Sequence, residues 1–223
     1  MESCFINCTG FRGGAIYSES VILEVEKCIF AFNNASFGSS IYNYGAKETN
    51  ISKSCFYLNE CQNGGIIIDS ILNSQCFHSF IQSNFSREFS KTSACFCIWG
   101  GFLHYLYNFI DHCSSSVGYG VVSLSLSKGI RSKMGVSSFS HCFGSRNGAT
   151  INIVSSHYYN LDQCYFMNNT CKNTVGDNIY FQDKNIFCEL NQCTLIGNIS
   201  NFFGDSKIGI LGIKLISSKT QQE

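Results

Sequence analysis

Two histidines stand in matching places along the chain, each directly before a cysteine. The segments are Ile110-Asp111-His112-Cys113 and Phe139-Ser140-His141-Cys142. If they stack in neighbouring turns of a repeat, the imidazoles lie about 5 Å apart, and such a pair is able to bind a metal ion or to exchange protons. In other copies of the segment the same place holds Lys27, Ser54, Gln163 and Gln192. His112 and His141 are therefore the candidate metal ligands, but we expect two solvent-exposed side chains and predict no metal site.

Asp177 and Asp205 are the candidate catalytic residues, because each follows a turn glycine in successive copies of the repeat. Polysaccharide hydrolases use a pair of carboxylates, and lyases use carboxylates that bind calcium together with a basic residue. No Arg or His stands at an equivalent position in these two copies, and Asp is an ordinary turn residue. We therefore predict a protein that is not an enzyme. A carbohydrate-active protein that binds or cleaves polysaccharide is the alternative.

The chain has 14 cysteines, an even number that permits disulfides in an oxidising compartment. Six of them follow an apolar residue and two polar ones, or stand at the equivalent place, and are predicted to form one column of small, free, buried thiols. These are Cys28, Cys55, Cys113, Cys142, Cys164 and Cys193. Cys8, Cys61 and Cys171 are the better disulfide candidates. Cys95 and Cys97 lack the second pair that a zinc site needs.

The elements that position these residues come from a repeat. A small-residue turn followed by a short apolar strand returns about every 27 residues between Gly13 and Gly204. The turn glycines are Gly13, Gly38, Gly64, Gly148, Gly176 and Gly204. One copy makes a circuit of three short strands, and stacked circuits place equivalent residues in columns. The Asn residues expected to form a hydrogen-bonded ladder are Asn33, Asn59, Asn168 or Asn169, and Asn198. We predict an all-β protein, a right-handed parallel β-helix of about eight coils.

Composition agrees with this fold and limits the partners. Proline is absent, and proline cannot donate to a β ladder. Basic and acidic residues balance at 15 each, so a nucleic-acid partner is not expected. No stretch reaches the ~20 apolar residues of a transmembrane helix, and no cofactor is expected.

One domain is predicted over residues 1–216, followed by a polar tail over residues 217–223. The repeat pattern blurs over residues 84–93 and 125–135, which we predict to be longer loops. The first coil begins almost at Met1 without an evident cap. Because solenoids need capped ends, we expect the chain to be a piece of a longer surface protein.

The FxxN and Gly-Gly-Ala-Ile motifs resemble the repeats of polymorphic membrane proteins of intracellular bacteria and of their cysteine-rich counterparts in parasitic protists. The turn is Gly13-Gly14-Ala15-Ile16, and FxxN occurs at Phe30–Asn33, Phe56–Asn59 and Phe166–Asn169. The resemblance covers roughly residues 4–208. It implies a pectin-lyase-like parallel β-helix, a place at the cell surface or outside the cell, and adhesion to a protein or glycan surface.

Overall fold

The computed structural model describes residues 2–70, 77–118, 120–126, 131–146, 148, 150–155, 158–172, 178–182, 187–197, 209–210 and 214–216. Throughout these residues the regular structure is β-strand, and every strand pair is parallel. No helix in this described part is long and apolar enough to cross a membrane. The expected polar tail over residues 217–223 lies outside the described residues.

The strands form four sheets, which we name A to D in the order in which the chain visits them. Sheet A contains β1 (Ser3–Ile6), β5 (Cys28–Ala31), β9 (Cys55–Tyr57), β13 (Asn84–Ser86), β17 (Phe109–Asp111), β21 (Ser138–Ser140), β25 (Tyr165–Met167), β29 (Thr194–Ile196) and β31 (Lys214–Ile216). Sheet B contains β2 (Thr9–Arg12), β6 (Asn34–Phe37), β10 (Glu60–Asn63), β14 (Phe89–Ser90), β18 (Ser114–Ser115), β22 (Phe143–Gly144) and β26 (Thr170–Cys171).

The other two sheets complete each circuit. Sheet C contains β3 (Ile16–Ser18), β7 (Ile41–Tyr44), β11 (Ile67–Ser70), β15 (Phe96–Trp99), β19 (Val122–Ser125), β23 (Ile151–Ser155) and β27 (Ile179–Phe181). Sheet D contains β4 (Ile22–Glu26), β8 (Glu48–Ser52), β12 (Phe77–Ile81), β16 (Phe102–Leu106), β20 (Arg131–Gly135), β24 (Tyr158–Asp162), β28 (Phe187–Asn191) and β30 (Gly209–Ile210).

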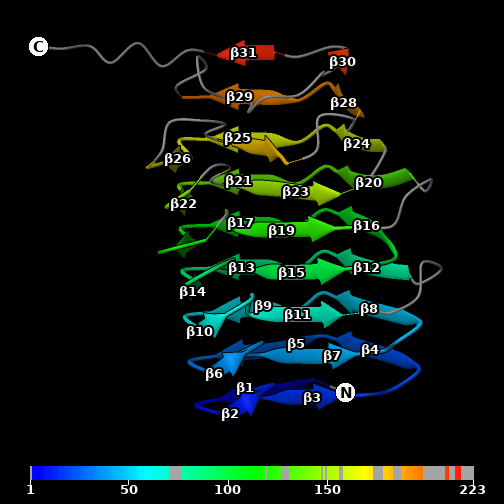
Figure 1. Cartoon of the computed structure of the whole chain (residues 1–223), viewed down its shortest axis with the longest axis vertical. Coiled ribbons are helices and arrows are strands. Elements are labelled where there is room, and N and C mark those ends of the chain that lie inside the picture. The colour runs from blue at the N-terminus through cyan, green and yellow to red at the C-terminus, as the bar shows by residue number, and fades with distance from the viewer. Residues whose placement is uncertain are drawn as a thin grey trace, which may run out of the picture.

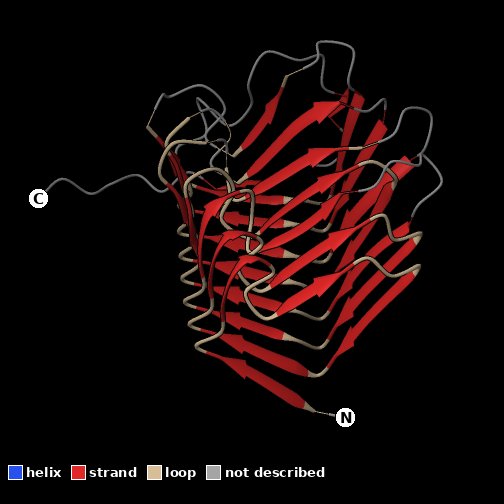
Figure 2. Cartoon of the chain, turned by 60° about the horizontal axis from the view of Figure 1, so that its bottom comes forward, coloured by secondary structure: helices blue, strands red, loops and turns tan. Residues whose placement is uncertain are grey.

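The molecule is a right-handed parallel β-helix, as predicted. Followed from β3 across the front of Figure 1 to β4 at the right and β5 behind, the chain climbs in the right-handed sense that parallel crossovers nearly always take. Two details differ from expectation. A coil that is described throughout has four strands rather than three, one in each of the four sheets, and Figure 2 shows the sheets as separate walls of the tube. The coil count differs slightly from eight, since the sheets hold nine, seven, seven and eight strands.

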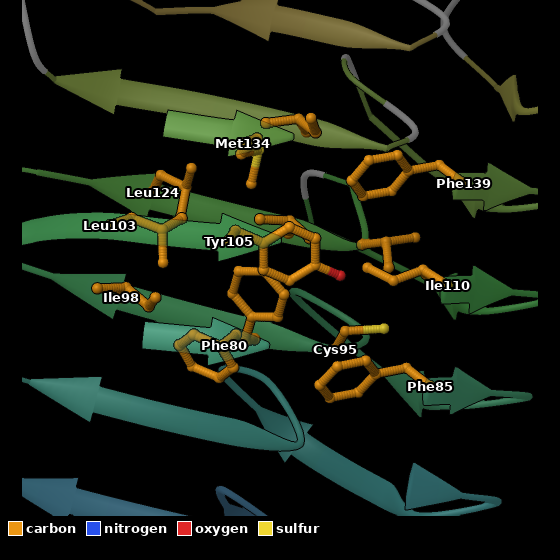
Figure 3. Close-up of a cluster of buried hydrophobic side chains, with 14 of the residues drawn as sticks. Phe80, Phe85, Cys95, Ile98, Leu103, Tyr105, Ile110, Leu124, Met134 and Phe139 are labelled. Atoms are coloured by element: carbon orange, nitrogen blue, oxygen red, sulfur yellow. The ribbon is translucent and has the colours of Figure 1, made fainter. Parts of the chain in front are cut away.

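Stacked aromatic rings fill the inner side of sheet A. Phe5, Phe30, Phe56 and Phe85 lie one above another, with ring centroids 4.6–4.9 Å apart and nearly parallel planes. The strand register places these residues directly opposite one another in successive coils. Ile110 continues the column, and side chains from sheets C and D pack against it from the other walls (Figure 3). The prediction that equivalent residues of successive coils form columns is confirmed for these Phe residues.

Two of the corners in each coil are made by one residue in the left-handed conformation. The fourteen described non-glycine residues with positive φ have φ between 46° and 56°. They fall into two columns, one between sheets D and A and one between sheets A and B. The first column is Lys27, Lys53, Gln82, Tyr107, Val136, Gln163 and Gln192. The second is Asn7, Phe32, Leu58, Arg87, His112, His141 and Asn168. Each bend consists of four consecutive residues: a core residue, the residue at the end of the strand, the left-handed residue, and a small or polar residue that points inward.

The inward residue of the A–B bend forms the predicted Asn ladder. The backbone amide of Asn33 donates to Oδ1 of Asn59 at 3.0 Å, and the amide of Cys142 donates to Oδ1 of Asn169 at 2.9 Å. The side-chain amides of Asn33, Asn59 and Asn169 in turn donate to carbonyls of the coil before. The FxxN motif is therefore this bend: Phe enters the core and Asn satisfies the buried corner. Asn168 is the left-handed residue, and Asn198 lies outside the described residues.

The prediction of a single cysteine column is wrong. Cys28, Cys164 and Cys193 occupy the inward place of the D–A bend, two residues before the core residue of sheet A. Cys113 and Cys142 occupy the inward place of the A–B bend, three residues after it. Cys55 lies on the outer face of sheet A. The two bends could not be told apart in the sequence, because in both an apolar core residue is followed three positions later by the inward residue.

The predicted turn glycines are confirmed where the structure describes them. Gly13, Gly38, Gly64 and Gly148 all have positive φ at the turn that leads into sheet C. At Gly13 a Cβ would lie 2.1 Å from the carbonyl oxygen of Ile16, so no larger residue fits. Gly176 and Gly204 lie outside the described residues. The longer loop predicted over residues 84–93 is wrong, because β13 and β14 lie there. Of the loop predicted over residues 125–135, residues 131–135 form β20, and residues 127–130 lie outside the described residues.

Candidate functional site

The predicted site residues fall in different places. Asp177 and Asp205, the candidate catalytic pair, lie outside the described residues. His112 and His141 lie where expected, in adjacent coils on the outside of the A–B bend, with ring centroids 4.8 Å apart and planes 20° from parallel. The other residues of their column are not the Lys27, Ser54, Gln163 and Gln192 predicted to share it, which belong to the D–A bend.

Asp111 joins the two histidines into one cluster. Its Oδ2 lies 2.7 Å from Nδ1 of His112, and its Oδ1 lies 3.4 Å from Nδ1 of His141. The hydroxyl of Ser140 donates to the same Oδ1 at 2.6 Å. Partial burial works to raise the pKa of Asp111, but the hydrogen bonds from Ser140, His112 and His141 together hold that pKa below its usual value. The carboxylate is the stable form.

The cluster is not a nucleophilic triad. In a Ser-His-Asp triad the serine hydroxyl bonds to the imidazole, which takes its proton, and the carboxylate orients that imidazole. Here Ser140 donates to Asp111 instead, so no hydroxyl faces a base. What the arrangement offers is two imidazole nitrogens and a carboxylate oxygen, a donor set for a metal ion.

The buried thiols among the described residues are not poised for chemistry, because they have almost no access to solvent. No two of the described cysteines are joined by a disulfide, so the predicted disulfide candidates are not linked. Burial raises the pKa of Cys97 to about 12 and raises the pKa of Cys95 and Cys142 well above the usual value. A reactive cysteine needs a lowered pKa and access to solvent. The buried cysteines therefore serve as small core residues.

A groove opens where sheet B turns into sheet C. Its volume is about 360 Å³, within the ~300–1,000 Å³ of ligand pockets. The floor is the outer side of β15 and β19, where Trp99 is 42% exposed. The walls come from the ends of sheet B strands in five successive coils, β6, β10, β14, β18 and β22. The lining residues are Phe37, Asn63, Gly64, Thr92, Ser93, Cys97, Trp99, Val117, Gly118, Ser123 and Arg146.

Reasoning from the sequence did not find this groove. Trp99 is the only tryptophan in the protein and directly precedes Gly100-Gly101. Strand parity was the available signal, since Phe96 and Ile98 are buried and Trp99 must then face outward. Arg146 carried no such signal, because it comes close to Trp99 only through the stacking of coils.

The fold and these sites define the chain as a right-handed parallel β-helix with a lateral groove and a histidine-carboxylate cluster. Comparisons with protein-family models, with curated proteins and with solved structures each find no match.

Proposed function

We propose that the protein is a non-enzymatic recognition module that binds an extended glycan chain in the groove between sheets B and C. The observation that carries this proposal is the exposed Trp99 ring at the bottom of a groove edged by polar side chains. Such rings bind sugars because the faces of pyranose rings are apolar, while hydroxyl, amide and guanidinium groups bond to the sugar hydroxyls. Asn63, Ser93, Ser123 and Arg146 supply those groups.

The shape of the groove favours a chain over a compact ligand. It touches five successive coils, a distance of about 19 Å along the axis at ~4.8 Å per coil. A ligand that lies along the axis therefore meets similar backbone at a regular interval. A polymer of repeated units fits such a surface.

The groove supports binding without cleavage. Glycoside hydrolysis requires two carboxyl groups around the bond that breaks, and none of the described lining residues is Asp or Glu. The resemblance to surface repeats of the polymorphic membrane protein type supports display outside the cell and a role in adhesion. Of the alternative given by the sequence, a protein that binds or cleaves polysaccharide, the proposal keeps the binding of polysaccharide and leaves out its cleavage.

A glycan array probed with the full chain tests the proposal, followed by titration of the glycans that bind. Because Trp99 is the only tryptophan, its fluorescence reports occupancy of the groove directly. We expect saturable emission changes and no shortened products by mass spectrometry. Trp99→Ala should weaken binding at least tenfold, since aromatic anchors often contribute ~2 kcal/mol and ~1.4 kcal/mol corresponds to tenfold.

Phe109→Ala is the matched control, because Phe109 is 56% exposed on the outer face of sheet A, away from the groove. It should leave affinity unchanged. Arg146→Gln should weaken the binding of acidic glycans more than the binding of neutral ones. Binding that survives Trp99→Ala unchanged would refute the groove as the site, and release of shortened products would refute the non-enzymatic role.

A further inference from the structure

The A–B bend holds Asp111, His112 and His141 together on the outside of the tube. β17 and β21 pair with Asp111 opposite Ser140, so the histidines that follow occupy the same place in adjacent coils. Both histidines have positive φ, 52° and 50°, and both side chains project into solvent. The backbone therefore fixes the spacing of the two rings, and the surrounding water leaves their nitrogens accessible.

The donor atoms are close enough to share one ion. One nitrogen from each histidine and one carboxylate oxygen all lie within 4.8 Å of one another. Zinc bonds to these atoms are ~2.0–2.2 Å long, so two ligand atoms on one ion lie up to about 4 Å apart. Small rotations of the exposed side chains bring all three atoms into that range.

The carboxylate is already held by a further partner. Ser140 is largely buried and donates to Oδ1 of Asp111 at 2.6 Å. Hydrogen bonds of this kind, which orient a ligand from outside the metal's own coordination shell, are a regular feature of metal sites.

A simple hydrogen-bonded pair accounts for the cluster less well. One histidine is enough for a contact of 2.7 Å with Asp111, and the second contact, at 3.4 Å, is long for a hydrogen bond. One cation bound by Asp111, His112 and His141 would give all three side chains a partner at a bonding distance.

We propose that Asp111, His112 and His141 bind one divalent transition-metal ion of the zinc class. Imidazole with a carboxylate suits zinc, nickel, copper and cobalt. Three protein ligands leave at least one position for water or for a donor atom of a binding partner. The site is on the A–B bend, whereas the groove is where sheet B meets sheet C, so the two proposals stand or fall separately.

The test is calorimetric titration of the chelator-treated full chain with zinc chloride, repeated with cobalt chloride and read by near-ultraviolet and visible absorption. Cobalt distinguishes this site from the cysteines, because thiolate ligands give an intense charge-transfer band. We expect one ion per chain and a cobalt spectrum without that band. His112→Asn and His141→Asn should each weaken binding at least tenfold. Ser140→Ala should weaken it about tenfold.

Asn is the right replacement because Asn7 and Asn168 occupy the same column and share its positive φ, so the variants should fold. Circular dichroism checks this. His104→Ala, on strand β16, is the control and should bind one ion as the parent does. The proposal is overturned by a thiolate band, by no binding in the parent, or by unchanged binding in the His112→Asn, His141→Asn double variant.

Discussion

Glu88 interrupts the Asn ladder and provides the sharpest test of how the coil is held together. Its side chain is fully buried and accepts hydrogen bonds from the amide of Asn59 at 2.8 Å and from the side-chain amide of Asn59 at 3.2 Å. Burial raises its pKa well above the usual value, the nearby Cys113 thiol adds to the rise, and the two bonds from Asn59 oppose it. The folded protein therefore keeps a proton here after the unfolded chain has lost it.

The sign of the pH effect follows from that difference. Above about pH 4.5 the unfolded chain has released the proton and the folded chain has not, so raising the pH favours unfolding. The free energy of unfolding then falls by about 1.4 kcal/mol per pH unit until the folded pKa is passed.

Glu88→Asn removes this loss and restores the ladder. In this variant the new side-chain oxygen would accept from Asn59, and the new side-chain amide would donate to the carbonyl of Phe56, as Asn59 does to Phe30 at 3.0 Å. We expect the stability of the variant to gain on that of the parent by about 1.4 kcal/mol per pH unit from about pH 4.5 until the folded pKa of Glu88 is passed. The measurement is urea unfolding at a series of pH values between about 5 and 8, followed by circular dichroism.

Glu60→Asn is the control, because it removes an exposed carboxylate one coil earlier. Its advantage over the parent should show no comparable trend. Parallel stability curves for Glu88→Asn and the parent across this range would refute the reasoning, since they would mean that the buried carboxyl does not hold its proton.

Three further changes test the core, the turns and the thiols. Phe56→Ala removes the centre of the ring stack and should lower the free energy of unfolding by about 3–5 kcal/mol, measured by urea unfolding; a loss under about 1 kcal/mol would contradict the packing. Gly38→Ala should lower the melting temperature more than Gly45→Ala does. Both glycines have positive φ, but only at Gly38 would a Cβ lie against backbone, 2.4 Å from the carbonyl oxygen of Ile41. Equal melting temperatures of the two variants would argue against this. Iodoacetamide at neutral pH should label the exposed Cys4 and Cys55 and spare Cys95 and Cys97 until urea is added, as counted by mass spectrometry; early labelling of Cys97 would contradict its high pKa.

The sequence was sufficient to predict the fold because its strongest signals are local. Phe30 and Phe56 recur with Asn33 and Asn59 three residues later, and that spacing alone defines a core residue, a bend and a ladder residue. What failed was telling one bend from the other. Val25 before Cys28 and Ile110 before Cys113 look alike in sequence, yet the first pair belongs to the D–A bend and the second to the A–B bend.

The sites were predicted less well than the fold, because they depend on which coil lies above which. His112 and His141 could be paired from their matching segments. The contacts of the Asp111 carboxylate with Nδ1 of both histidines could be found only from the register of β17 and β21. The groove is lined from five coils, and Trp99 and Arg146 both line it only because the coils stack. Stacking, not sequence distance, sets those contacts.

The left-handed residues at the bends place exposed side chains at a regular spacing along the outside of the tube. Each described coil displays one such side chain per bend, ~4.8 Å from the next, and the fourteen found there range from Lys to Phe to His. Since these positions hold side chains of many kinds, one chemical group can be replaced by another there by a single substitution. A scaffold of this kind can acquire new surface chemistry without altering the structure that holds it.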